Sequence, residues 1–408
     1  MQEFIFMQDF LTSMKFAHIA DCHIGSWRDP KLNIMSTKAF IKAVKLSVEK
    51  KVDFILISGD LFNTSLPSID KLKTVVEILK SLQELEISVY IIPGSHDFSP
   101  SGKTMLDVLE SAGLLINVVK GKEVNGRLRL KFATDKTGAK ITGMLGKRGS
   151  LEKGFYEDLD RESLESEKGF KIFMFHSAIT EFKSVSQMDS TPLSFLPKGF
   201  DYYAAGHVHE RIEKIVPLYG KIIFPGPLFP NNFKELEELK MGGFYIYDNG
   251  KTSFIPIELH AVESFNIKGK TAEEINAKLM EIPKTELKNK IVTLRVSGKL
   301  ESGRLTDIDF QEVFAAIYEK RAYYVMKNTA GLLSTEFEEV KIHKDSPEEI
   351  EDALIDEHIG QTDCPLQNER ELTKQLLNVF SVERDEGEKV ADFEERLTKN
   401  ADKLLDKG

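Results

Sequence analysis

Short apolar runs that stop at polar residues recur through the first part of the chain. Residues 14–21 (MKFAHIAD), 52–60 (VDFILISGD) and 87–97 (ISVYIIPGSHD) each carry several apolar residues and end in acids or histidines. Such runs are typical of strands buried on both faces. Helical periodicity over 37–51 and 70–85 separates them. The order strand, helix, strand, helix, strand predicts a layered α/β sheet, with its site beyond the carboxyl ends of the strands.

Later segments extend this domain and add two others. Further strands are predicted up to about residue 260, at 128–134, 139–145, 169–176, 200–207 and 220–227. We therefore expect one domain over 14–262, preceded by an extension of residues 1–13 that is either a disordered arm or an alternative start. Alternating apolar residues around 290–300 and an amphipathic helix after them predict a small α+β domain over 264–343.

The end of the chain has a different pattern. Between 348 and 408 apolar residues recur at helical spacing on both sides of a polar break, which predicts a hairpin of two amphipathic helices. The apolar positions are Leu372, Leu376, Val379, Phe380, Val390, Phe393, Leu397 and Leu404. This hairpin either packs on its own body or docks on the helices of a partner.

Charge is concentrated at that end. The chain of 408 residues has a formal net charge of −10, and residues 345–408 hold 19 acidic and 8 basic residues, or −11, which leaves +1 for the rest. A near-neutral body neither excludes nor indicates nucleic acid. The absence of any apolar run of roughly 18 residues predicts no membrane span, and two distant cysteines are typical of a reducing compartment.

Histidines and aspartates gather at the predicted strand ends. Asp21 and His23 lie two residues apart, so both side chains point to one side and can hold one metal ion. Asp60 follows the second strand, and a carboxylate there can bridge two cations about 3.5 to 4 Å apart, as two-metal hydrolysis requires. Two further strands end in the same way, at His176, and at His207 with His209. Mixed imidazole and carboxylate ligands favour Mn²⁺, Fe²⁺ or Zn²⁺.

Two nearby residues are expected to be structural. A single histidine near a strand end is more often a core residue, and we interpret His18 in that way. Cys22 lies between the two residues of the first ligand pair, where its side chain points away from the site, so packing is its expected role.

The motifs in order resemble those of the calcineurin-like metallophosphoesterases. They are D-x-H at 21–23, G-D at 59–60, G-S-H-D at 94–97 where the family has G-N-H-D, the single His176, and G-H-x-H at 206–209. GDLFNTSLPS, IIPGSHD and YYAAGHVHERIE narrow the resemblance to the nuclease subunit of double-strand-break repair complexes, the SbcD-like or meiotic-recombination nucleases. The resemblance covers about residues 14–345. It implies a four-layer α-β-β-α sandwich with a capping domain and a C-terminal helical hairpin.

The resemblance also implies roles for single residues. Asp21, His23, Asp60 and His209 would hold one Mn²⁺, and Asp60, His176 and His207 the second. His96 would not bind metal; it would donate a proton to the leaving oxygen or stabilise the pentacovalent phosphorane, with Asp97 orienting its ring. Ser95 replaces the family's asparagine ligand and is a poorer metal ligand, so the second ion would bind more weakly. Asn63 stands where some members carry histidine, and it can hydrogen-bond a phosphate but cannot transfer protons.

Loop residues near these motifs are candidate DNA contacts, because loops at strand C-terminal ends face the site. They are Trp27, Arg28, Asn63, Lys147, Arg148 and Arg211.

By resemblance, the chain is expected to be a manganese-dependent 3′ to 5′ exonuclease and single-strand endonuclease in double-strand-break repair. It would act in the cytoplasm at the nucleoid, with a coiled-coil ABC-type ATPase partner. A homodimer is expected as well; Met105, Leu106 and Leu109 would pair across a two-fold axis or belong to the core. The alternatives are a phosphodiesterase or phosphatase for small molecules or cyclic nucleotides, and a DNA-binding scaffold subunit with weak nuclease activity.

Overall fold

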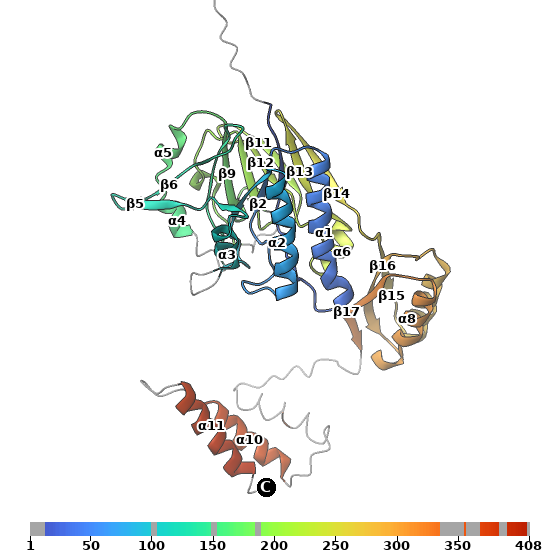
Figure 1. Cartoon of the computed structure of the whole chain (residues 1–408). Coiled ribbons are helices and arrows are strands. Elements are labelled where there is room, and N and C mark those ends of the chain that lie inside the picture. Colours follow the sequence, from blue (N-terminus) through green and yellow to red (C-terminus); the bar gives the residue numbers. More distant parts are fainter. Residues whose placement is uncertain are drawn as a thin grey trace, which may run out of the picture. The chain divides into compact units, whose positions relative to one another are not determined.

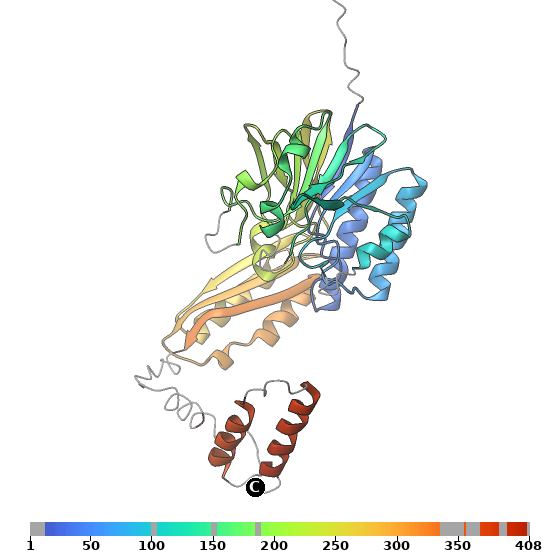
Figure 2. The ribbon, with the colours of Figure 1, turned by 90° about the vertical axis from the view of Figure 1, so that its left-hand side faces the viewer.

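The protein divides into two compact units. The computed structural model describes residues 13–98, 104–147, 153–183, 189–334, 355, 368–382 and 390–405. Unit 1 ends at Leu333 and unit 2 begins at Ser334. Unit 1 contains the large sheets and the small α/β domain, and the described part of unit 2 includes a pair of helices near the end of the chain (Figures 1 and 2).

The first large sheet has six strands in the order β14-β13-β1-β2-β3-β4. They are β1 Lys15–Ile19, β2 Phe54–Ser58, β3 Ser88–Ile92, β4 Ile116–Asn117, β13 Gly242–Asp248 and β14 Lys251–Ile257. The strands from β1 to β4 are parallel, with Ile19 of β1 opposite Ile57 of β2, and β13 is antiparallel to β1. The carboxyl ends of β1, β2 and β3 therefore meet at one edge.

The second large sheet also has six strands, in the order β11-β12-β10-β9-β8-β7. They are β7 Ala133–Thr134, β8 Lys140–Gly143, β9 Lys171–His176, β10 Tyr202–Gly206, β11 Ile212–Val216 and β12 Gly220–Phe224. The four strands β8, β9, β10 and β12 are parallel, and Gly206 lies opposite His176. A separate hairpin pairs β5 Gly121–Val124 with β6 Arg127–Leu130.

Helices cover the outer faces of both sheets. They are α1 Pro30–Glu49, α2 Ile69–Glu84, α3 Met105–Ser111, α4 Lys153–Glu157, α5 Arg161–Glu165 and α6 Phe233–Leu239. Capping residues in the sequence favour the starts of these helices. Asp29 caps α1 by accepting from the N–H of Lys31, and Pro30 follows at the first helical position. In α3, Thr104 and Asp107 form a reciprocal capping box. Figure 1 shows α1 and α2 side by side on the first sheet.

Three apolar clusters hold these layers together. Between the sheets, Phe16 stacks on Phe54 and on Tyr247 with ring centroids 5.0 and 4.6 Å apart, and Met174 and Ile223 of the second sheet join them. A second cluster fills the space between the first sheet and its helices, and a third does so for the second sheet. Helix, sheet, sheet and helix are thus four layers, which confirms the predicted fold class.

The small domain is built on a three-stranded sheet in the order β15-β16-β17. Its elements are β15 Val262–Lys268, α7 Ala272–Glu281, β16 Ile291–Leu300, α8 Phe310–Glu319 and β17 Tyr324–Ser334, with short 3-10 turns at Ile282–Lys284 and Leu305–Asp307. Ile275, Leu294 and Ile317 lie in its own core. The sheet begins at Val262, at the edge of the range predicted for the large domain.

The sequence patterns did not reveal β11, β13 and β14. A usable signal existed for β13 and β14, because Asn249 and Gly250 join them with φ values of 48° and 90°. Two such residues between alternating segments are typical of a tight hairpin. β11 is an edge strand whose five positions are all exposed or half-exposed, so it lacks the apolar run that marks a buried strand.

Unit 2 contains the predicted pair of C-terminal helices, α10 Glu369–Phe380 and α11 Val390–Leu405. They pack against each other (Figure 2). Residues 383–389, which include most of the predicted polar break, lie outside the described residues, as do 1–12. Among the described helices of both units, none is long and apolar enough to cross a membrane.

Candidate metal centre

The candidate ligands follow the carboxyl ends of β1, β2, β9 and β10. Their backbone is unusual: Asp21, His23, Asp60 and His207 have φ values of 49°, 43°, 52° and 80°. Residues with a side chain rarely adopt this left-handed region, and such strain persists where function needs it. The two sheets also approach closely here, because a Cβ on Gly206 would lie 2.0 Å from the carbonyl oxygen of Ser58.

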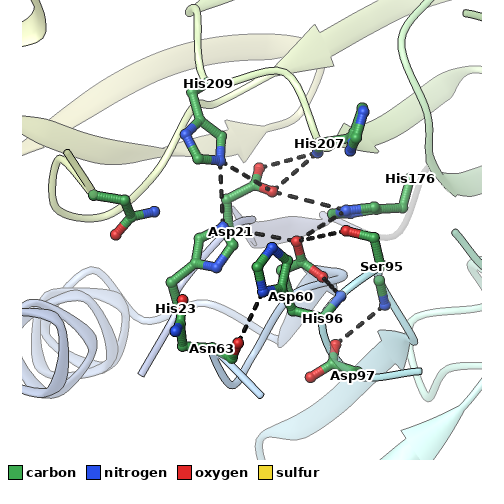
Figure 3. Close-up of polar contacts among 12 residues, drawn as sticks. Asp21, His23, Asp60, Asn63, Ser95, His96, Asp97, His176, His207 and His209 are labelled. Carbon is green, nitrogen blue, oxygen red and sulfur yellow. Dashed lines mark hydrogen bonds and ion pairs between the residues drawn. The ribbon is translucent and has the colours of Figure 1, made fainter. Parts of the chain in front are cut away.

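Three overlapping groups of side chains have the spacing of a metal site. Within each group one ligand atom per residue lies within 4.8 Å of the others. The groups are Asp21, His23 and His209; His23, Asp60 and His96; and Asp21, Asp60 and His176. Figure 3 shows these side chains gathered around the two aspartates.

Asp60 lies at the centre of the arrangement. Its Oδ2 atom is 3.2 Å from Nε2 of His176 and 3.7 Å from Nε2 of His23. Its Oδ1 atom accepts the backbone N–H of His96 at 2.8 Å. This carboxylate is almost fully buried and faces ligands on both sides, as a bridging carboxylate between two cations requires.

Hydrogen bonds fix which ring nitrogen is free to bind metal. Nδ1 of His176 donates to the carbonyl of Ser58 at 2.8 Å, so Nε2 is the nitrogen of this ring that can give a lone pair to a metal ion. Nδ1 of His209 donates to Oε1 of Glu235 at 2.8 Å, which leaves Nε2 of that ring free as well. Both free nitrogens point toward Asp21, at 4.0 and 3.9 Å.

These free nitrogens fit a cation. Nε2 of His176 is buried without a hydrogen-bond partner, although carboxylate oxygens surround it. A lone pair that faces a carboxylate oxygen is repelled unless a positive charge lies between them. Imidazole nitrogens and carboxylate oxygens together suit divalent transition metals. The residues present therefore fit the predicted metal site.

The pKa values point the same way. Burial disfavours the charged ring of His176, but the adjacent Asp60 outweighs burial and raises the pKa of His176 to about 10. Burial raises the pKa of Asp21 to about 6, against the opposing effect of His176 and His209. Burial would likewise raise the pKa of Asp60, but neighbouring His176 keeps it below its ordinary value. The pocket thus stabilises positive charge among its buried acids.

Two predicted ligands of the second metal, His207 and Ser95, lie outside the three groups. The ring of His207 is 5.3 Å from the ring of His176 and belongs to none of the three groups, while its backbone N–H donates to Asp21 at 3.0 Å. The hydroxyl of Ser95 donates to Oδ2 of Asp60 at 3.3 Å. Ser95 therefore touches the central carboxylate.

The expected orientation of the His96 ring by Asp97 is wrong in this structure. Nδ1 of His96 instead donates to the backbone carbonyl of Asn63 at 2.8 Å. Asp97 accepts the backbone N–H groups of Leu61, Phe62 and Gly94, so it holds together the loops after β2 and β3. Three backbone donors thus fix this buried carboxylate between the two loops.

The candidate DNA contacts differ in their exposure and in the groups that they contact. The indole N–H of Trp27 donates to the carbonyl of Pro230 at 2.9 Å and the ring packs on the core, so that N–H is already occupied. Arg28 and Arg211 are exposed, and Arg211 lies over the ring of Phe254. Lys147 lies over the ring of Phe155 at 4.4 Å. Arg148 lies outside the described residues.

Both residues expected to be structural are in the core. His18 is fully buried, and its ring nitrogens lie 3.0 Å from the hydroxyls of Tyr202 and Ser58. Burial lowers the pKa of His18 to about 3, so the ring is neutral. Cys22 is buried in the apolar cluster between the first sheet and its helices.

Glu235 is a site residue that the sequence patterns missed. It lies on α6, far along the chain from any strand end, and contacts the site only through His209. The available signal was local: Glu235 follows Asn232 by three residues, the spacing of a helix N-cap. That spacing predicts a helix start and says nothing of a metal site.

The predicted partner-binding residues lie on α10 and α11. Leu372, Leu376 and Val379 of α10 are half-buried, and Phe380 at its end is 58% exposed. On α11 the half-buried positions are Phe393, Leu397 and Leu404. The side chain of Val390 lies outside the described residues.

Comparisons with known proteins identify the family of the first domain and several relatives of the chain. The family described as calcineurin-like phosphoesterase matches residues 14–211. The chain is 29% identical to the DNA double-strand break repair protein Mre11 of Archaeoglobus fulgidus, over 82% of this chain and 77% of that protein. It is 28% identical to the protein of the same name from Methanococcus maripaludis, over 58% of this chain and 63% of that protein.

A third relative and one solved structure complete the comparison. The corresponding protein of Methanocaldococcus jannaschii is 28% identical over 65% of this chain and 70% of that protein. A dimetal phosphatase from Danio rerio superposes at a TM-score of 0.37 and 10% identity, over 60% of this chain and 99% of that one, which is too remote to bear on the fold. The segment 14–211 matched by the family contains every ligand candidate described above, from Asp21 to His209. Residues 14–211 therefore form a domain of the calcineurin-like phosphoesterase family.

Proposed function

We propose that this protein is a manganese-dependent DNA nuclease, with 3′ to 5′ exonuclease and single-strand endonuclease activity, that acts in double-strand-break repair. The observation that carries the proposal is the buried group of Asp21, His23, Asp60, His176 and His209, in a chain whose relatives are named for double-strand-break repair.

We assign a separate role to each residue of the site. Asp21, His23, Asp60 and His209 would hold one Mn²⁺, and Asp60, His176 and His207 the second, with Ser95 beside Asp60. When bound, the cations would supply charge stabilisation for in-line attack on a phosphodiester.

His96 has the position of a proton donor. Its Nδ1 is held by the carbonyl of Asn63, so the remaining ring nitrogen is the one available to a leaving oxygen. The ring lies beside that of His23, with centroids 4.8 Å apart, and is only half-buried. A group at the rim of the ligands can reach substrate while the buried carboxylates hold metal.

The surroundings of the site suit a charged polymer. A hollow of about 510 Å³ adjoins His209 and is lined by Arg211, Phe254 and Met241 among others. Arg211 is exposed, and its guanidinium over Phe254 provides both a positive charge and a flat face. Arg28 lies in the loop that follows His23. Positive side chains at strand-end loops favour phosphate binding without sequence reading.

For the acidic tail we propose docking on the helices of a coiled-coil ABC-type ATPase. Leu377 and Phe380 of α10 and Leu405 of α11 are 40%, 58% and 42% exposed, and amphipathic helices bind partners through such faces. Deleting residues 348–408 should abolish ATPase association and leave Mn²⁺-dependent DNA cleavage intact. Loss of cleavage together with folding would contradict this division of roles.

We also propose a homodimer, through different residues from those first considered. Leu106 and Leu109 of α3 are core residues, each only 1% exposed. The exposed apolar residues of this region are Leu66, Ile69 and Val108, at 78%, 82% and 57%. Light scattering of the full chain against Ile69→Glu should show a dimer that dissociates, and an unchanged mass would contradict this interface.

The test of the nuclease proposal compares three substrates. Purified protein with Mn²⁺ is incubated with labelled DNA, a nitrophenyl phosphoester and a cyclic nucleotide. Hydrolysis of DNA that is lost in His96→Ala and retained in His260→Ala supports the proposal, since His260 stacks on Tyr323 in the small domain. Turnover of only a small ester supports a small-molecule phosphodiesterase, and DNA binding without cleavage a scaffold subunit.

A further inference from the structure

Helix α6 contacts both the candidate metal centre and the small domain. It spans Phe233–Leu239 and packs against β15 and β16 of the small sheet. Figure 1 shows α6 beside α1, at the side of the large domain from which the chain enters β15 and β16. Two glutamates on this helix make its principal polar contacts.

The first glutamate, Glu235, is fixed toward the metal centre. Its Oε1 atom accepts from Nδ1 of His209 at 2.8 Å and from the side-chain amide of Asn232 at 2.5 Å. Its Oε2 atom accepts the backbone N–H of Asn231 at 2.8 Å. Only 16% of this side chain is exposed. With both oxygens occupied, the carboxylate holds the His209 ring in one orientation.

The second glutamate, Glu237, is fixed toward the small domain. Its carboxylate pairs with the guanidinium of Arg295 on β16, with Nε at 3.2 and 3.0 Å from its two oxygens and Nη2 at 2.5 Å from Oε2. The guanidinium also lies over the ring of Phe233, the first residue of α6. Charge-assisted pairs of this geometry are among the stronger polar contacts in proteins.

The helix joins these two contacts rigidly. Successive residues turn by about 100° around an α-helix, so residues two apart point to nearly opposite sides. Glu235 and Glu237 therefore face the metal centre and the small domain respectively, while Leu236 between them is fully buried in the core. A displacement of β16 that pulls on Glu237 would rotate or shift the carboxylate of Glu235.

We propose that Glu235 is a positioning residue for His209 and that the Arg295–Glu237 pair couples the small domain to metal binding through α6. This inference rests on the proposed two-metal site. Glu235 sets the tautomer that leaves Nε2 of His209 free, and its negative charge makes that nitrogen a stronger ligand. The position of the small domain would then adjust the affinity of the ion held by Asp21, His23 and His209.

The first experiment measures Mn²⁺ binding to the full chain by titration calorimetry, without DNA. Glu235→Ala should weaken the site that contains His209 by about 10- to 100-fold. Glu235→Gln keeps an acceptor for Nδ1 of His209 and should lose less. The matched control is Glu238→Ala on the same helix, whose carboxylate forms an exposed pair with Lys234. Wild-type affinity in Glu235→Ala, or an equal loss in Glu238→Ala, would overturn the positioning role.

The second experiment is a double-mutant cycle. Arg295→Ala should weaken Mn²⁺ binding by roughly two- to tenfold, although the guanidinium of Arg295 pairs with Glu237 and not with a ligand. The same change in a Glu235→Ala background should have no further effect, because the link is already broken. Arg295→Lys keeps the charge without the two-point geometry and should fall between. Additive losses, or no loss in Arg295→Ala, would overturn the coupling.

Separate control measurements distinguish a loss of folding from a loss of function. Circular dichroism and thermal unfolding of the chelator-treated variants show whether α6 and the domain remain folded. If the substitutions instead disturb the structure generally, their losses of Mn²⁺ affinity should add in the double mutant. That additive result is the one that would overturn the coupling. Because the readout is Mn²⁺ affinity, wild-type protein that binds Mn²⁺ but does not cleave DNA would contradict the proposed function and leave this inference standing.

Discussion

The Nε2 atoms of His23 and His209 lie 3.3 Å apart, one from each large sheet. His209 already donates through Nδ1 to Glu235, so the neutral ring presents a lone pair to His23. Carboxylate oxygens of Asp60 and Asp21 lie 3.7 and 3.9 Å from these nitrogens. A single divalent cation satisfies all four groups at once, whereas a single proton satisfies only two.

Bound metal should therefore stabilise the fold. Adding Mn²⁺ to chelator-treated protein should raise the melting temperature, with about 2.7 kcal/mol gained at a concentration 100 times the dissociation constant. Scanning calorimetry measures this change. Asp60→Asn should lose most of the gain, and Asp248→Asn, a surface residue paired with Lys15, should keep it. Equal gains in both variants would argue that Mn²⁺ binds elsewhere.

His96→Ala should separate catalysis from metal binding. The ring lies in one group with His23 and Asp60, so its position alone is compatible with either a ligand or an acid. As an acid, its removal should lower the rate of DNA cleavage by about 10²- to 10⁴-fold and leave Mn²⁺ stoichiometry unchanged. Rate and bound Mn²⁺ are measured on the same preparation. If the variant binds one ion fewer, His96 is a ligand and the acid role fails.

Ser95→Asn should tighten the second metal. The Ser95 hydroxyl donates to Asp60 at 3.3 Å, so it competes for the carboxylate that a cation needs. An asparagine would offer a carbonyl oxygen on a longer stem. Calorimetry should show a lower dissociation constant for the weaker ion and cleavage should need less Mn²⁺. Unchanged binding of that ion would count against the assigned role of this position.

The buried His18 should make the fold sensitive to acid. Its pKa is lowered by burial to about 3 in the folded protein, against 6.5 when exposed. Between these values the unfolded chain binds a proton that the folded chain does not, so stability falls as pH drops below 6.5. From pH 6.5 to 5 this single group should cost about 2 kcal/mol.

A non-titrating variant measures that effect. Urea unfolding of wild type and His18→Gln is compared at pH 7 and pH 5, and the fall in unfolding free energy should be about 2 kcal/mol smaller in the variant. The lost contacts with Tyr202 and Ser58 lower stability at both pH values alike. An identical fall in the two proteins would show that His18 does not remain neutral.

Sequence patterns reveal those parts of the site that lie at strand ends. Asp21, Asp60 and His176 end apolar runs, and parallel strands bring such residues to one edge, which the fold reproduces. The motif spacing even anticipated the i, i+2 pair of Asp21 and His23. The layered α/β class followed from the same runs.

Contacts between distant loops could not be predicted from the sequence patterns. The carbonyl of Asn63 that holds His96, and the carbonyl of Pro230 that holds Trp27, are backbone groups that carry no residue-type signal. Asp97 follows His96 directly, so its role was assigned to the ring, whereas the turn points its carboxylate at backbone N–H groups. Glu235 reaches the site only because α6 packs back onto the first sheet.

The central claim is that this chain holds two metal ions among the residues between Asp21 and His209. A crystal structure of the protein soaked in Mn²⁺, with anomalous scattering recorded at the manganese edge, tests it most directly. We expect two peaks, one bound by Asp21, His23, Asp60 and His209 and the other by Asp60 and His176. No peak among these side chains, with Mn²⁺ bound elsewhere or not at all, would contradict it.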